Sequence, residues 1–210
     1  MFIDRFKRAG LLGAALLSLP LWSVSVHAAD VATPDALIRQ VSVEVIDTVK
    51  ADKSIQGGDI SKIIALVDSK VMPHVNFQRM TASAVGRSWR SATPEQQKRL
   101  QEEFKALLVR TYAGALSQVR EHTIALKPMR AGADDTEVVV RTEVKGKGDP
   151  IQLDYRLEKT ADGWKIYDVN VLGVWLVEQY KSSFAQEINA SGIDGLIAKL
   201  TERNKAAAKR

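Results

Sequence analysis

Two carboxylates and two phenols on neighbouring predicted strands are the side chains best suited to acid–base chemistry. Asp154 and Tyr155 fall in one strand, and Tyr167 and Asp168 fall in the next. An aspartate and a tyrosine in a dry cavity are able to enolise a small substrate. Alternation along the strand places Asp154 on the wet face, which favours a solvated or ion-paired residue. Asp168 shares a face with Ile166, so we interpret it as a helix cap or an arginine partner rather than a catalytic group.

Three arginines and a tryptophan form a small basic cluster in the sequence. Arg79, Arg87 and Arg90 lie close together, and Trp89 lies among them. A cluster of this kind is able to hold a phosphate group. Arginines also pair with carboxylates and cap backbone carbonyls, and we favour that structural interpretation. It predicts that Asp168 pairs with an arginine such as Arg79 or Arg90.

Metal and nucleophile chemistry find little support in the sequence. His74 and His122 are far apart, and the chain has no cysteine, so we expect no zinc site and no other metal. The chain has no G-x-S-x-G motif, and no histidine lies near Ser88 in sequence. A triad built from distant residues stays open but has no positive signal. The sequence therefore gives no positive signal for a zinc site or a serine hydrolase.

The N-terminus has the pattern of a secretory signal peptide. Arg5, Lys7 and Arg8 precede an apolar run over 11–26, and small residues follow up to Ala28. This pattern predicts cleavage after Ala28, with residues 1–28 removed, and export to the periplasm. The formal net charge of +5 is spread without a block of like charges, which gives no indication of nucleic acid binding. Without disulfides, stability has to come from the core.

Helical patterns fill the first half of the chain, which we expect to be helical over 34–120. Thr33-Pro34-Asp35 predicts a helix start, and an apolar stripe continues to residue 50. Gly57-Gly58 ends that segment, and Asp59 and Asn76 are predicted to cap two short helices over 60–67 and 77–85. Thr93-Pro94-Glu95-Gln96 forms a capping box that opens a long helix over 94–120.

After residue 122 the hydrophobic period changes to two. Four strands are predicted, over 123–129, 137–144, 151–158 and 164–171, and together they give a sheet over 122–171. Short turns between them favour an antiparallel meander with one dry face. Helices followed by strands indicate an α+β fold, and we expect the long helix to cover the dry face.

The segment over 164–184 starts as a strand and ends as a helix. Simple alternation places Tyr167, Val169 and Val171 on one face and Ile166 and Asp168 on the other. The connection over 171–177 is apolar and uncharged, whereas most connections are polar, so it is either buried or in contact with something other than water. C-terminal helices are predicted over 175–205, with a break at Ser191-Gly192, and a frayed tail over 206–210.

Several segments, taken in order, resemble the MlaC (toluene-tolerance) family of periplasmic phospholipid carriers. They are residues 77–80, 85–96, 111–112, 164–169, 172–174 and 192–197. The resemblance covers nearly the whole chain after the signal peptide. Trp175 departs from it, since a smaller residue is expected there, and an inward-pointing Trp175 would narrow a cavity.

The resemblance implies a single lipid-carrier domain over 29–205, with an NTF2-like cone made by a curved sheet and an apolar cavity for acyl chains. It implies a carrier that moves phospholipid between an inner-membrane ABC transporter complex, with its membrane-anchored subunit, and an outer-membrane lipoprotein–porin complex. Such a carrier maintains outer-membrane lipid asymmetry. It implies no catalytic residue, no metal and no cofactor, with bound phospholipid as the cargo.

Inward alternation combined with this resemblance gives a set of expected acyl-chain contacts. They are Met80, Val85, Leu108, Tyr112, Val140, Leu153, Tyr155, Val169, Val171 and Val174. Two alternatives stay open. One is a cone-fold enzyme acting on a small apolar substrate, and the other is a periplasmic scaffold or holdase with a filled core.

Overall fold

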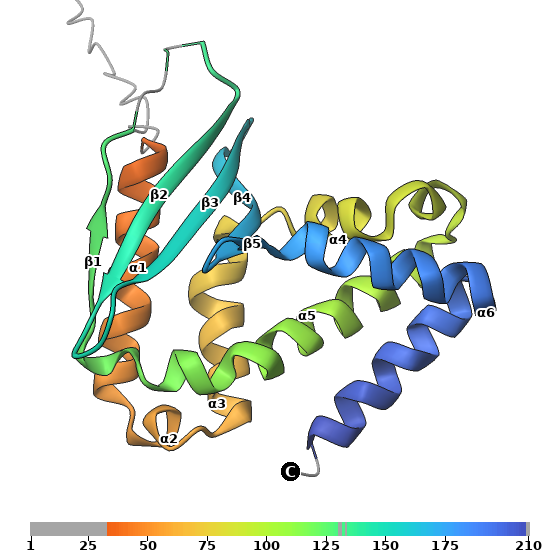
Figure 1. The fold of residues 1–210 in the computed structure, drawn as a ribbon, viewed down its shortest axis with the longest axis horizontal. Helices are drawn as coiled ribbons and strands as arrows, with labels where there is room; N and C mark the ends of the chain where they lie inside the picture. The colour runs from red at the N-terminus through yellow and green to blue at the C-terminus, as the bar shows by residue number, and fades with distance from the viewer. Residues whose placement is uncertain (1–32, 130–131, 133, 209–210) are drawn as a thin grey trace, which may run out of the picture. The chain divides into compact units, whose positions relative to one another are not determined.

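The computed structural model describes residues 33–129, 132 and 134–208, which all belong to one compact unit. The predicted signal peptide over 1–28 lies outside the described residues. Helices form the first half, an antiparallel sheet follows, and a long helix ends the chain. The predicted α+β class is confirmed (Figure 1).

The N-terminal part contains α1 (Pro34–Ala51), α2 (Lys53–Gln56) and α3 (Ile60–Leu66), which runs into a π-helical turn, η1 (Val67–Val71), and a 3-10 turn, η2 (Met72–His74). Asp59 caps α3 as predicted, because its side chain accepts hydrogen bonds from the backbone N–H groups of Ser61 and Lys62. The short helix α2 was not predicted. Asp52 caps it in the same manner.

Two further helices lead to the sheet, and both begin where their caps predict. They are α4 (Phe77–Val85) and α5 (Pro94–Ser117), with 3-10 turns η3 (Gly86–Ser91) before α5 and η4 (Val119–Glu121) after it. Asn76 caps α4. At the start of α5, the Gln96 N–H donates to Thr93 Oγ1 at 3.2 Å, and the Thr93 N–H donates to Gln96 Oε1 at 3.0 Å. This reciprocal pair is the predicted capping box.

The sheet has five antiparallel strands rather than the four predicted. Their order is β1 (Thr123–Leu126), β2 (Glu137–Lys145), β3 (Ile151–Thr160), β4 (Gly163–Val171) and β5 (Val174–Trp175). The extra strand exists because Leu172 and Gly173 both have positive φ, at 52° and 89°. Two such residues form the tight turn that closes a two-residue hairpin, so the chain pairs again with β4.

A bulge in β4 corrects the predicted faces of that strand. Leu157 of β3 pairs with Ile166, whereas the preceding Arg156 pairs with Asp168, so Tyr167 is an extra residue. Ile166 therefore shares a face with Val169, and not with Asp168 as simple alternation predicted. We call the face that carries Ile166 and Val169 the inner face.

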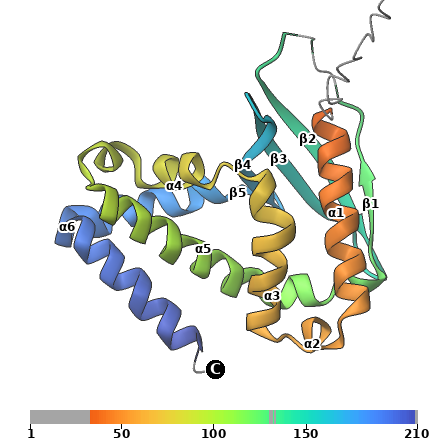
Figure 2. The ribbon, with the colours of Figure 1, turned by 180° about the vertical axis from the view of Figure 1, so that it is seen from behind.

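The helix that covers the inner face is α1 rather than the long helix. Figure 1 and Figure 2 show α1 lying along one side of the sheet with α3 beside it. Helix α1 contacts β1 and β2, whereas α5 packs mainly against α6, α3 and α4. The expectation that α5 covers the sheet was wrong, because much of its apolar face meets other helices: Leu100, Phe104 and Leu107 are buried in a cluster with residues of α4 and α6.

The last helix, α6 (Leu176–Ala208), folds back on itself at Gly192 (Figure 1). Gly192 has φ 72° and ψ −175°, a conformation that only glycine adopts readily. The predicted break at this position is confirmed. Residues 206–208 continue the helix, as alanine-rich sequence favours, and fraying of the tail over 206–210 stays a prediction.

Two glycine-to-alanine substitutions should have opposite effects on stability. Gly192→Ala should lower the free energy of unfolding by about 1–3 kcal/mol, because alanine is strained at this φ and ψ. Gly114→Ala should raise it by about 0.5–1 kcal/mol, since Gly114 lies inside α5 and an added Cβ meets nothing within 4 Å. Urea denaturation measures both. If Gly192→Ala raised the free energy of unfolding as much as Gly114→Ala does, the fold-back would not depend on the Gly192 conformation.

Candidate functional site

An apolar pocket of about 290 Å³ lies where two hydrophobic clusters meet. The sheet core contains Ile38 of α1, Val140 of β2 and Ile166 of β4. The helical core joins α4, α5 and α6, and in it Phe104 contacts Tyr180 edge to face with ring centroids 5.1 Å apart. Neither cluster fills the space between them.

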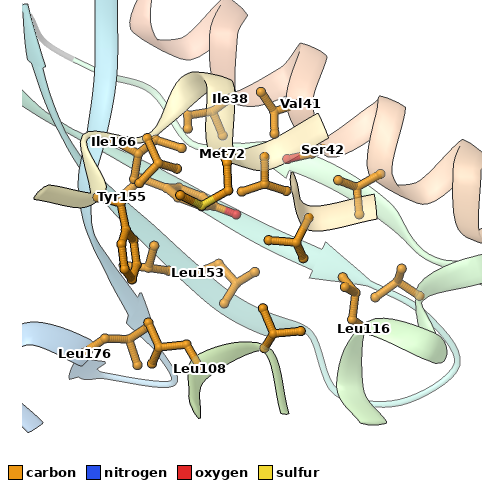
Figure 3. A pocket seen from close by; sticks show the side chains of 18 of the residues that line it. Ile38, Val41, Ser42, Met72, Leu108, Leu116, Leu153, Tyr155, Ile166 and Leu176 are labelled. Atoms are coloured by element: carbon orange, nitrogen blue, oxygen red, sulfur yellow. The ribbon is translucent and has the colours of Figure 1, made fainter. Parts of the chain in front are cut away.

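The pocket wall draws side chains from helices on one side and strands on the other. Figure 3 shows Ile38 and Val41 of α1 facing Leu108 of α5 and Leu176 of α6, with Tyr155 between them. The remaining lining residues are Ser42, Val45, Ile46, Val67, Val71, Met72, Val75, Phe77, Met80, Lys105, Val109, Leu116, Val119, Ile124, Val144, Leu153, Ile166 and Val169.

Ser42, Tyr155 and Lys105 are the described lining residues with polar groups, but nearly all of the surface that the wall presents to the pocket is hydrocarbon. Burial raises the pKa of Tyr155 above its ordinary value of 10.0, and the neighbouring hydroxyls of Thr142 and Ser42 only partly oppose this. The phenol is therefore neutral at physiological pH. Among the described lining residues there is no aspartate, glutamate or histidine, so the wall offers no ordinary general base.

The structure brings five of the ten predicted lipid contacts to the pocket wall: Met80, Leu108, Leu153, Tyr155 and Val169. The other five lie elsewhere. Val85 and Val140 are buried in the helical and sheet cores, Tyr112 and Val171 pack against the helical core, and Val174 is half exposed. Contact with lipid stays a prediction for all ten.

Sequence reasoning missed the contribution of α1 and η1 to the wall. Val41 and Val45 of α1, and Val67 and Val71 of η1, all line the pocket. The apolar stripe of α1 was recognised, but none of its residues was among the expected acyl-chain contacts. An apolar stripe does not reveal whether the facing surface touches it, so periodicity alone does not identify these residues.

Asp168 performs a structural role on the outer face of the sheet, away from the pocket. Its Oδ1 accepts hydrogen bonds from the backbone N–H groups of Val169 at 2.9 Å and Val177 at 3.1 Å, and the second of these caps the start of α6. Arg156 Nη1 donates to Oδ2 at 3.1 Å. The predicted structural role is supported, but the arginine partner is Arg156 rather than Arg79 or Arg90. Burial raises the pKa of Asp168 despite these partners.

Asp154 lies on the same outer face with fewer partners. Gln152 Nε2 donates to its Oδ2 at 2.9 Å, and among the described residues no donor reaches its buried Oδ1. The side chain is buried rather than solvated, which corrects the prediction of a wet position. Because Tyr155 between Asp154 and Arg156 faces the pocket, Asp154 points away from it.

Trp175 also lies on the outer face. It pairs with Asn170 across β4 and β5, and its ring lies under the Arg156 guanidinium, with 4.0 Å from Cζ to the ring centroid. This arrangement is a cation–π contact. Trp175 does not line the pocket and therefore does not narrow it.

Arg79 is occupied by carboxylates rather than free to hold a phosphate. It pairs with Glu158 and with Glu137, the latter at 2.7 Å, and its guanidinium lies 3.7 Å from the Tyr167 ring centroid. The Arg79 contact helps to hold the pKa of Glu137 below its ordinary value. Arg87 and Arg90 are exposed on η3, apart from this network.

The apolar connection over 171–177 divides into two parts. Leu176 and Val177 are buried in the helical core, whereas Leu172 and Val174 at the hairpin tip are 67% and 49% exposed. The described residues contain no helix long and apolar enough to span a membrane, and no group of three or more potential metal ligands.

Comparison with known proteins gives a consistent set of relatives. Residues 39–202 match the family described as MlaC protein. The chain is 26% identical over 208 residues to toluene tolerance protein ttg2D of Pseudomonas putida, covering 95% of this chain and 94% of the relative. It is 24% identical over 174 residues to the intermembrane phospholipid transport system binding protein MlaC of Haemophilus influenzae, covering 81% of each.

A solved structure is similar over most of the chain. It is the phospholipid-binding protein from Ralstonia solanacearum in complex with a phospholipid, at 1.53 Å resolution. The TM-score is 0.81 and the identity is 49%, and the match covers 83% of this chain and 98% of the other.

Proposed function

The chain belongs to the MlaC family, and from that membership we propose that it is a soluble periplasmic carrier that holds phospholipid tails in the pocket between the sheet core and the helical core. The observation that supports this most is the wall itself, whose described side chains are apolar apart from Ser42, Tyr155 and Lys105. A pocket of that composition favours hydrocarbon over water.

Carrying a phospholipid through water requires such an enclosure. Two acyl chains contain roughly 30 methylenes together. Exposure of one methylene to water costs on the order of 0.8 kcal/mol, so exposure of both chains costs about 24 kcal/mol. An apolar cavity removes much of this cost. The described backbone beside the pocket is helix, helical turn or strand apart from Val75, whose N–H donates to the Met72 carbonyl at 3.1 Å, so most of its polar groups are already paired.

The pocket has to widen when it loads. At about 290 Å³ it lies near the lower end of the ~300–1,000 Å³ of small-molecule sites, and a two-tailed lipid is larger than most such ligands. The turn η1 is the wall segment we expect to move. Two partly exposed ion pairs hold it, Lys70 to Glu44 of α1 at 3.3 Å and Asp68 to Lys105 of α5 at 2.7 Å. An exposed ion pair stabilises a fold by about 0–1 kcal/mol, so breaking these pairs costs little free energy.

We place the carrier in the pathway that its family implies. It would receive and deliver phospholipid between an inner-membrane ABC transporter complex and an outer-membrane lipoprotein–porin complex, and so maintain outer-membrane lipid asymmetry. The predicted signal peptide supports a periplasmic location. We also propose that the fold is NTF2-like, as in the family resemblance. Two of the relatives are named for phospholipid binding or transport and none for an enzymatic reaction, which supports a carrier over an enzyme.

Uptake of a tail-labelled phospholipid tests this function. The protein is mixed with vesicles that contain a phospholipid with a fluorescent acyl chain, and the vesicles are then removed by flotation. We expect lipid to stay with the protein and its fluorophore to be shielded from iodide quenching. Lipid that remains with the protein but is fully quenched would indicate surface adhesion, and absence of uptake would reject the carrier.

A further inference from the structure

Lys105 is the one charged side chain among the described residues that line the pocket. Lys105 lies one turn before Leu108 and Val109 on the same side of α5, and both of these line the pocket. Its Nζ donates to Asp68 Oδ1 at 2.7 Å. Asp68 belongs to η1 and lies beside Val67, which also lines the pocket.

The Lys105–Asp68 pair marks a place where the apolar wall reaches water. The side chains of Lys105 and Asp68 are 32% and 45% exposed. A lipid with its tails in the pocket must leave its phosphate at such a boundary, because a phosphate anion is costly to bury without a cationic partner. The second ion pair of η1, between Lys70 and Glu44, does not include a pocket-lining cation.

We propose that Lys105 binds the phosphate of the lipid whose tails occupy the pocket, and that Asp68 holds the ammonium when no lipid is bound. This inference rests on the proposed carrier function and adds the residue that recognises the head group. Lysine is a compact, strongly hydrated cation that binds phosphate as a point charge. Phosphate oxygens and the Asp68 carboxylate offer the same kind of acceptor, so the exchange replaces one ion pair with another. It also releases η1 from α5, which couples recognition of the head group to widening of the pocket.

Two lipids with identical tails separate the head-group contact from the tail contacts. The probes are dipalmitoyl phosphatidylglycerol and dipalmitoylglycerol, which lacks phosphate, each offered in phosphatidylcholine vesicles with a labelled tail. For Lys105→Gln we expect the preference for phosphatidylglycerol over diacylglycerol to fall roughly three- to tenfold relative to the unmodified protein, as expected for a charged hydrogen bond at a partly exposed site. Diacylglycerol is the reference in every variant, so an effect of the lost Asp68 pair on the pocket itself cancels from the ratio of the two affinities.

Three matched variants complete the design. Lys105→Arg should retain the preference, and Lys98→Gln, at an exposed lysine of the same helix, should leave it unaltered. Asp68→Asn should increase the preference for phosphatidylglycerol over diacylglycerol, because it removes the carboxylate that competes with the phosphate for Lys105. An unchanged preference in Lys105→Gln would overturn the proposal.

Two further outcomes would also overturn it, and they differ from each other. If inorganic phosphate binds at Lys105 as tightly as phosphatidylglycerol, the site recognises free phosphate rather than the head group of a docked lipid. If the unmodified protein binds neither phosphatidylglycerol nor diacylglycerol, the carrier function itself fails. If the unmodified protein binds diacylglycerol but its preference for phosphatidylglycerol does not depend on Lys105, only the head-group inference fails.

Discussion

Leu153→Asp should empty the pocket of lipid while the protein remains folded. Leu153 lines the pocket but belongs to neither buried cluster, so a carboxylate there is hydrated when the pocket is empty. Acyl chains would have to remove that water, at a cost of at least about 3 kcal/mol. We expect the affinity for a tail-labelled phospholipid to fall more than about 100-fold, and the free energy of unfolding to change by less than about 1 kcal/mol.

A matched charge outside the pocket provides the control. Val43 is 44% exposed on α1, between the pocket-lining residues Val41 and Val45. Val43→Asp adds the same charge a short distance away and should bind lipid normally. Leu108→Asp, on the opposite wall, should repeat the loss. Normal lipid binding by both pocket variants, each shown to be folded, would place the tails elsewhere.

Asp168→Ala should destabilise the protein by about 3 kcal/mol, because the cap of α6 is lost and the Val169 and Val177 N–H groups lose their acceptor. Asp154→Ala is the comparison, since Asp154 is also buried on the same face but has a single hydrogen-bond donor. It should cost less than about 1 kcal/mol. Urea denaturation measures both, and equal losses would show that burial, rather than the cap, determines the importance of Asp168.

The charge of Asp168 should matter less than its oxygens. Burial raises the pKa of this carboxyl above 3.8, so the folded state binds its proton more tightly than the unfolded chain. The stabilisation from that proton is complete below pH 3.8 and is lost as pH rises through the folded pKa. Asp168→Asn, which resembles the protonated acid and keeps an acceptor for Val177, should therefore lose only about 1 kcal/mol at pH 7. A loss as large as that of Asp168→Ala would show that the negative charge is required.

Local signals predicted the helix starts and most strands correctly. Asp59, Asn76 and the Thr93–Gln96 capping box each place a side-chain acceptor at the first turn, and this chemistry depends only on neighbouring residues. Gly192 likewise marks its own fold-back. These features are readable from sequence because their causes lie within a few residues.

The errors arose where the cause lies on another element. The bulge at Tyr167 depends on the pairing of β4 with β3, and it moved Ile166 to the inner face. The strand β5 depends on Leu172 adopting a positive φ, which leucine rarely does. These two features changed the faces and the number of strands.

The candidate site was half predictable for the same reason. Leu153, Tyr155 and Val169 reach the wall by strand alternation, and Met80 and Leu108 reach it from the apolar faces of α4 and α5. Whether an inward residue meets the pocket or a packed core depends on how α1, α5 and η1 are spaced. Val140 is inward yet fully buried in the sheet core, whereas Val41 was not among the expected contacts and lines the pocket.

The mass of the intact protein, purified without detergent and measured under native conditions, tests the central claim most directly. We predict protein that carries the additional mass of diacyl phospholipid, which organic extraction should release and identify. Protein at its bare mass, which also takes up no phospholipid when incubated with vesicles, would contradict the claim that the pocket carries lipid.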